Sequence, residues 1–114
     1  MFELSEQQVS AINAAHLEKR NQRFLEELRR LKWVPAGMSD EQALERIKAA
    51  VDDGRKLDII DDEDAVRMAA LAFLPEKTRN DQRIAQLVTT VLNNTDSPAQ
   101  ERLDFIFRQI LKIR

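Results

Sequence analysis

The stretch Asp61-Asp62-Glu63-Asp64-Ala65-Val66-Arg67-Met68-Ala69-Ala70-Leu71-Ala72-Phe73-Leu74 decides the fold of this chain. Its opening acids predict a helix N-terminus capped by Asp61 or Asp62, because carboxylates accept hydrogen bonds there and complement the helix dipole. Apolar residues then cover most of the helix circumference, and such a helix is buried on all sides. We therefore expect residues 61–74 to form the central helix, which Pro75 ends.

A long helix is predicted at the start of the chain, from Ser5 to about Lys32. This stretch contains neither Gly nor Pro, and Ser5 with Gln8 forms a capping-box pattern. Its end is expected just before Pro35, because proline disfavours helical backbone in the preceding residue.

A second helix is predicted from Asp40 to Asp53, between the first helix and the central one. Ser39 opens it with another capping box, and Gly54 is expected as its C-terminal cap. The short connector that follows has no partner strand elsewhere in the sequence. We expect it to place Leu57 and Ile60 in the core.

Two further helices are predicted after Pro75. The fourth begins at Thr78 or Asn80, and its apolar residues follow helical spacing: Ile84, Leu87, Val88, Val91 and Leu92. The fifth begins with Ser97 as cap and Pro98 in the first turn. No repeat or linker divides the chain, so we expect an all-α protein: one compact, bundle-like domain of about five helices over residues 1–114.

The composition argues against catalysis and metal binding. The 114 residues include no Cys, one His and two Gly, which excludes disulfides, thiolate chemistry, multi-histidine metal sites and glycine-rich phosphate loops. The histidine, His16, follows Ile12 by one turn, and we expect it to be partly buried and hydrogen-bonded rather than a general base. We therefore expect no enzyme activity, no cofactor and no metal ion.

Charge is distributed unevenly along the chain. The 18 basic and 20 acidic residues give a net charge of −2, yet residues 38–75 contain five basic and ten acidic residues, or −5. Nucleic-acid binding depends on excess Lys and Arg, so nucleic acid is not an expected partner. A helix-turn-helix is rejected, because its recognition helix would begin with acids. No apolar run approaches the ~20 residues of a membrane span, and the start resembles no signal peptide, so we expect a cytoplasmic protein that does not enter a membrane.

Two groups of residues are candidates for binding a protein partner. Trp33 and Met38 are the expected apolar anchors, because tryptophan is common at interface hot spots. The second group is the acidic segment: Asp58, Asp61, Asp62, Glu63 and Asp64. A calcium loop is excluded here, because no register places a glycine at its sixth position. Each group has a structural alternative, since Trp33 can fold over the core and the acids can simply cap and solvate a helix.

The order of these elements resembles a family of small helical accessory proteins encoded in bacterial type VI secretion effector loci. The first helix of that family leads from a Gln-containing polar segment to paired arginines, as Ser5-Glu6-Gln7-Gln8 and Arg29-Arg30 do here. Residues 47–54 resemble its Ile-containing, Gly-ended second helix, and residues 59–74 its acid-capped apolar helix. The last two helices follow in the same order around Ser97-Pro98, so the resemblance covers nearly the whole chain.

The resemblance implies a non-enzymatic, protein-binding accessory module, a co-chaperone or adaptor-associated protein for a type VI secretion effector. The alternative is an immunity protein that neutralises a cognate toxin, with its acids imitating a phosphate-bearing substrate. A transcriptional regulator is a third reading. The expected partner is thus an effector, a toxin or an effector adaptor. Pairing of the long first helix with its own copy, to form a homodimer, is a further expectation.

Overall fold

The computed structural model describes residues 6–112, with side chains from His16 onward, and all regular elements in this range are helical. In chain order they are α1 (Glu6–Arg30), α2 (Asp40–Lys56), α3 (Asp62–Leu71), α4 (Glu76–Arg79), α5 (Gln82–Leu92), α6 (Ala99–Phe105) and the π-helical turn η1 (Ile106–Ile110). The all-α prediction is confirmed, and the first helix is the longest. The helix count differs from the expected five, because residues 76–79 form a short helix of their own.

The end of α1 is set by a left-handed residue before the chain reaches Pro35. Lys32 has a φ of 65°, and the N–H groups of Trp33 and Lys32 donate to the carbonyls of Leu28 (2.8 Å) and Arg29 (3.0 Å). This Schellman pattern satisfies carbonyls that otherwise lack donors at a helix end. It also turns Trp33 back against the core. The capping box predicted at Ser5 lies outside the described residues.

The two predictions for the ends of α2 had different outcomes. The capping box is confirmed: the Gln42 N–H donates to Ser39 Oγ (3.1 Å), and the Ser39 N–H donates to Gln42 Oε1 (3.4 Å). The prediction that Gly54 caps the other end was wrong, because α2 continues to Lys56 and Gly54 is buried within it. A Cβ at Gly54 would lie 3.0 Å from Cγ of Met68 on α3. The glycine therefore permits close packing of the two helices.

The connector between α2 and α3 buries a different isoleucine from the one predicted. Ile59 is 1% exposed, whereas Ile60 is 56% exposed. Asp58 adopts a φ of 62°, and the resulting turn lets the Ile59 N–H donate to the Gly54 carbonyl at 2.8 Å. The turn thus folds Ile59 back over α2 and leaves Ile60 in solvent. The prediction that Ile60 enters the core was wrong for this reason.

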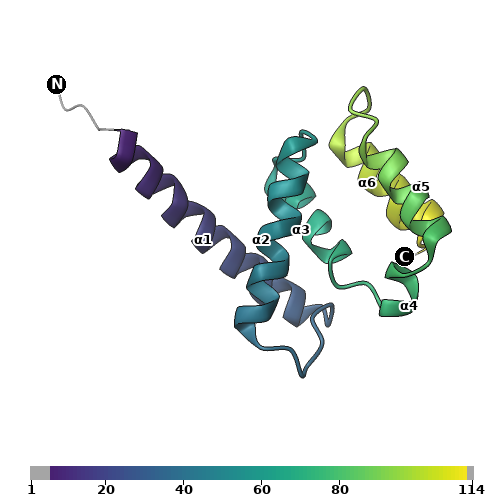
Figure 1. The fold of residues 1–114 in the computed structure, drawn as a ribbon, viewed down its shortest axis with the longest axis horizontal. Helices are drawn as coiled ribbons and strands as arrows, with labels where there is room; N and C mark the ends of the chain where they lie inside the picture. Colours follow the sequence, from purple (N-terminus) through teal and green to yellow (C-terminus); the bar gives the residue numbers. More distant parts are fainter. Residues whose placement is uncertain (1–5, 113–114) are drawn as a thin grey trace.

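The central position predicted for α3 is confirmed, and α3 joins two apolar clusters, which also share Phe107 on η1. Ala65, Ala69 and Ala70 pack with α1 and α2 in the first cluster, whereas Met68 belongs to a second cluster with α5, α6 and η1. In the described part of the chain, neither α1 nor α2 packs against α5 or α6. Figure 1 shows this arrangement, with α3 between the α1–α2 pair and the α5–α6 pair. The helix ends at Leu71, earlier than the predicted Leu74.

A buried arginine connects the second cluster to the end of α2. Arg102 on α6 is 3% exposed, and its guanidinium donates to the carbonyls of Leu92 (2.7 Å), Leu57 (2.8 Å) and Ser97 (3.0 Å). Leu57 and Leu92 stand at the C-terminal ends of α2 and α5, where the helix dipole favours a cation. Arg102 therefore fixes three segments of the chain to one another.

None of the helices within residues 6–112 combines the length and apolar character that crossing a membrane requires.

Candidate functional site

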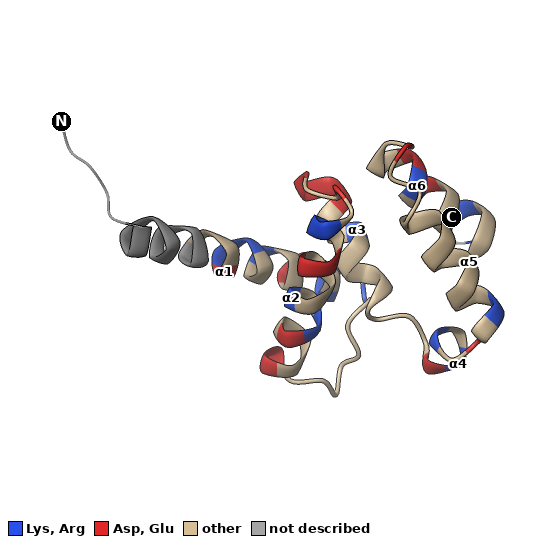
Figure 2. Ribbon diagram, turned by 45° about the horizontal axis from the view of Figure 1, so that its top comes forward, with Lys and Arg blue, Asp and Glu red and all other residues tan. Residues whose placement is uncertain are grey.

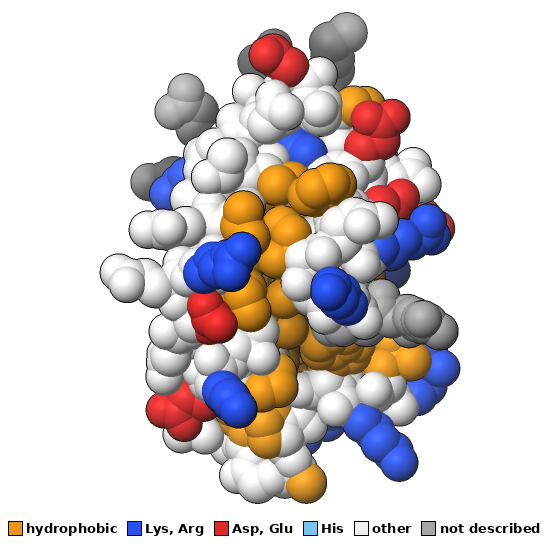
Figure 3. All heavy atoms as spheres, turned by 90° about the vertical axis from the view of Figure 1, so that its right-hand side faces the viewer, with side chains coloured by type: hydrophobic (Ala, Val, Ile, Leu, Met, Phe, Trp, Pro, Cys, Tyr) orange, Lys and Arg blue, Asp and Glu red, His pale blue; other side chains and the backbone are white. Residues whose placement is uncertain are grey.

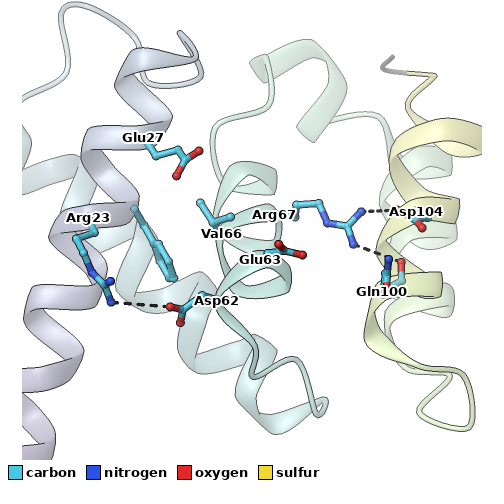
Figure 4. A pocket seen from close by; sticks show the side chains of 9 residues that line it. Arg23, Glu27, Asp62, Glu63, Val66, Arg67, Gln100 and Asp104 are labelled. Carbon is cyan, nitrogen blue, oxygen red and sulfur yellow. Dashed lines mark hydrogen bonds and ion pairs between the residues drawn. The ribbon is translucent and has the colours of Figure 1, made fainter.

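A groove lies between α1 and α6, with α3 as its floor. It consists of two adjoining depressions, of about 680 Å³ and about 280 Å³, which share Glu27, Val66, Arg67 and Asp104. We call it the central groove. Figure 4 shows the larger depression, with α1 on one side and α6 on the other. It exists because α1 and α6 each pack against α3 but not against each other.

Helical spacing places the lining residues on the faces that border the groove. On α3, Asp62, Val66 and Ala70 follow each other at steps of four, and Glu63 and Arg67 lie beside them. Steps of four also relate Arg23 and Glu27 on α1 to Leu31 just after it. The same steps relate Gln100, Asp104 and Arg108 on the other wall. The groove is thus built from single faces of three helical segments.

Arg67 crosses the middle of the central groove and joins α3 to α6. Its guanidinium lies 2.5 Å from Asp104 Oδ1 and 3.1 Å from Asp64 Oδ1, and it also donates to the Gln100 carbonyl at 3.4 Å. Burial lowers the pKa of Arg67, but hydrogen bonds and charge interactions with Asp104 and Asp64 raise that pKa by more, so it stands above its ordinary value. Arg67 therefore remains charged throughout the neutral pH range.

Asp62 joins the opposite wall to α3. Its carboxylate lies 2.7 Å from Arg20 Nε and 3.9 Å from Arg23 Nη2, and both arginines are on α1. Arg20 also donates to the carbonyl of Ile60, and its guanidinium lies 5.2 Å from the ring centre of Phe24, within cation–π range. Salt bridges therefore hold both walls to α3, Arg20–Asp62 on one side and Arg67–Asp104 on the other.

The smaller depression is mainly apolar. Trp33 and Phe107 meet edge to face there, with ring centres 6.0 Å apart and planes at 89°, a favourable aromatic geometry. Leu31 lies beside them and is 52% exposed. Arg108, exposed and on η1, supplies a cation at this end. The central groove therefore runs from exposed acids near Asp62 to an apolar slot next to an arginine.

The structure brings together three of the residues predicted for partner binding: Trp33, Asp62 and Glu63 line the central groove. Met38 is half-buried and packs on the first apolar cluster, away from the groove. Asp61 is the exposed N-cap residue of α3, and its side chain makes no capping hydrogen bond. Asp58 occupies the left-handed turn after α2. Asp64 is 8% exposed and bound to Arg67, so its carboxylate supports the groove from below.

Several lining residues were missed by sequence reasoning. Arg67 had a detectable signal, because it is the one charged residue between Ala65 and Leu74, in an otherwise apolar segment. Helical spacing indicated that Phe107 is apolar-facing, but nothing in the sequence indicated that Asp104 and Phe107 line a groove, since that depends on how α6 and η1 lie against α3. The expected partial burial of His16 was wrong: the side chain is exposed on the part of α1 that extends from the body.

The acidic residues gather around the two ends of α2 and the start of α3, as Figure 2 shows. Two of the nearby carboxylates pair with arginines on another segment: Asp40 with Arg29 at 2.7 Å and Asp62 with Arg20 at 2.7 Å. Among the side chains described, no three His, Asp or Glu residues converge in a way that could hold a metal ion. The central groove thus presents apolar and charged side chains together.

No model of a protein family, no curated protein and no solved structure matches this chain.

Proposed function

We propose that the protein is a non-enzymatic accessory module that binds a protein partner through the central groove. In this proposal it serves as a co-chaperone or adaptor-associated protein of a type VI secretion effector, and the partner is that effector or its adaptor. The observation that carries the proposal is the groove itself, which presents exposed acids, an apolar slot and arginines from α1, α3 and η1. The assignment to type VI secretion rests on the resemblance in the order of elements.

The lining residues define the kind of segment that fits. The slot beside Leu31, Trp33 and Phe107 suits a large apolar side chain, because burying it there removes apolar surface from water on both partners. Glu63 is exposed and forms no ion pair with any described residue, so it suits a cationic side chain further along the same segment. An amphipathic helix with an apolar anchor and a basic residue meets both demands.

The proposal is tested by capture of the partner from the native host with groove variants of the tagged full chain. Leu31→Asp should weaken binding by about 30-fold, because it places a charge in the apolar slot. Glu63→Arg should weaken it by about 10-fold, because a cation would face the partner's basic residue. Isothermal titration with the recovered effector or adaptor measures both losses.

Matched control variants separate groove effects from general effects of charge. Ile60→Asp introduces the same acid at an apolar residue that is 56% exposed on the α2–α3 connector, and Asp53→Arg makes the same charge reversal as Glu63→Arg on the exposed face of α2. Both should bind like the wild type. Recovery of no effector, toxin or adaptor at micromolar protein contradicts the proposed function. Equal losses of affinity in the groove variants and the control variants contradict binding through the central groove.

An immunity protein remains a second candidate because exposed acids stand at the mouth of the groove. The Asp62 side chain is 61% exposed, and Glu63 is exposed beside it, so the two present negative charge as a phosphate-bearing substrate does. Against this, Arg20 and Arg23 already offset the charge of Asp62. Co-expression with the toxin encoded by the neighbouring gene tests this candidate. Protection of growth by the wild type that is lost in Glu63→Arg supports an immunity role, and growth arrest despite the wild-type protein contradicts it.

A further inference from the structure

From Ile84 onward, the outer face of α5 contains no charged residue, in a protein that is otherwise rich in charge. No residue from Ile84 to Thr95 is charged, although 33% of the whole chain is. Much of this segment is nevertheless in contact with solvent: Gln86, Leu87, Thr89 and Thr90 are exposed. Depletion of charge on an exposed surface is characteristic of the core of a protein interface.

The same face has a protruding apolar residue beside an apolar hollow. Leu87 is 46% exposed, and Phe105 on α6 is 50% exposed. The hollow of about 510 Å³ lies between the C-terminal half of α5 and α6, lined by Thr90, Val91, Asn94, Ser97, Glu101, Arg102 and Phe105. Figure 3 shows apolar side chains running down this end of the molecule in a hollowed stripe.

We propose that this face binds a second copy of the chain, with the two α5 helices antiparallel across a two-fold axis near Leu87. In such a pair, each surface must complement itself. Leu87 is the middle residue of α5 (Gln82–Leu92), so the axis brings the middles of the two helices together. Each Leu87 then lies next to the hollow of the other copy, beside Val91 and Phe105.

Charge at the rim favours the antiparallel arrangement. Arg83 lies on the N-terminal half of α5, on the same face as Leu87, because the two are four residues apart. Glu101 lies at the rim of the hollow, beside the C-terminal half of α5. Both are exposed, and neither forms an ion pair with any described residue. Antiparallel helices bring each Arg83 to the second copy's Glu101, whereas parallel helices would bring the two Arg83 side chains together.

The pairing leaves the central groove open. The wall of that groove is formed by Gln100, Asp104 and Arg108, whereas the hollow is bordered by Glu101 and Phe105. These two sets lie on different faces of the same helical segment, so a dimer would present two grooves. The inference therefore does not depend on the proposed function, and each can fail without the other.

Analytical ultracentrifugation of the full chain at about 1 to 100 μM tests the pairing. The wild type should sediment with twice the monomer mass of 13.2 kDa at the upper concentrations. Leu87→Glu should raise the dissociation constant by about 100-fold, because both copies lose an apolar contact at the axis and gain facing carboxylates. Ile60→Glu, at an exposed isoleucine on the α2–α3 connector, should leave the mass unchanged. Circular dichroism confirms that each variant is folded.

A charge exchange tests the orientation. Arg83→Glu and Glu101→Arg should each raise the dissociation constant by about 10-fold, and the double variant should restore it to within about threefold of the wild type. A wild type that stays monomeric at about 100 μM overturns the pairing. A dimer whose dissociation constant is unchanged by Leu87→Glu places the contact elsewhere and also overturns the proposal. If the double variant dissociates as readily as the single variants, the antiparallel arrangement is overturned.

Discussion

The backbone conformation of Asp58 gives this residue a structural role that its charge does not reveal. Its left-handed φ of 62° lies just beyond the end of α2, where the N–H groups of Asp58 and Ile59 donate to the carbonyls of Arg55 (3.2 Å) and Gly54 (2.8 Å). Non-glycine residues adopt this conformation at a cost, and Asp is among those that tolerate it best. Asp58 therefore ends a helix, and it lies outside the central groove that Asp62 and Glu63 line.

We predict that Asp58→Gly stabilises the protein by about 0.5 kcal/mol, because glycine adopts the left-handed conformation without strain but loses more backbone entropy on folding. Urea denaturation followed by circular dichroism measures this change. The same substitution at Asp53, within α2 and exposed, should instead destabilise by about 0.5 kcal/mol through lost helix propensity. A destabilised Asp58→Gly variant would mean that the Asp58 carboxylate stabilises the fold by more than its left-handed backbone conformation costs.

A second prediction concerns the buried guanidinium of Arg102. Replacement by Met should destabilise the protein by about 3 kcal/mol or more, because the three carbonyls that Arg102 satisfies would lose their donor in a buried setting. Arg102→Lys keeps the charge but cannot reach all three carbonyls with the same geometry, so an intermediate loss is expected. Arg79→Met, at an exposed arginine of α4, should change stability by less than about 0.5 kcal/mol. Equal effects at both arginines would contradict the role assigned to Arg102.

At the scale of elements, the sequence predicted what depends on local patterns and missed what depends on contacts between elements. The Ser39 capping box and the apolar helix after Asp61 were predictable because each signal lies within a few residues, whereas the cap predicted at Ser97 was wrong, since Pro98 is the N-cap residue of α6. Gly54 was wrongly predicted as a helix cap, because the need for a glycine there comes from the close approach of Met68 on α3. The central groove was only partly foreseeable: Trp33, Asp62 and Glu63 were predicted, but Asp104 and Phe107 depend on how α6 lies against α3.

The Arg67–Asp104 contact between α3 and α6 leads to a prediction about coupling between elements. A double-mutant cycle with Arg67→Met and Asp104→Ala should give a coupling energy of about 1 kcal/mol, because the pair is partly shielded and its side chains are 29% and 37% exposed. The exposed pair Arg30–Glu27 on α1, at 3.1 Å, should give less than about 0.5 kcal/mol. Added salt should reduce the coupling energy of the exposed Arg30–Glu27 pair more than that of the Arg67–Asp104 pair. Coupling near zero at Arg67–Asp104 would show that apolar packing alone holds the groove wall.

At the scale of the whole molecule, α3 lies between the two apolar clusters and contributes to both, as Phe107 on η1 also does. The first cluster contains Ile47, and the second contains Leu103; both are fully buried. Because α1 and α2 do not pack against α5 or α6 in the described residues, we expect the second cluster to open while the first stays closed, with Phe107 and the Arg102–Leu57 hydrogen bond as the links between them. The central groove lies between these two parts, so any such opening would change its width.

We therefore predict that the two clusters respond separately to core substitutions in native-state hydrogen exchange. Leu103→Ala should reduce the free energy of opening by about 2–4 kcal/mol for amides of α5 and α6, and by clearly less for amides of α1 and α2. Ile47→Ala should produce the reverse pattern. The amides of α3 should respond to both substitutions, because Met68 and Ala69 belong to different clusters. Uniform losses in all helices for both variants would show one cooperative unit, and would make the central groove a rigid surface whose width the partner cannot alter.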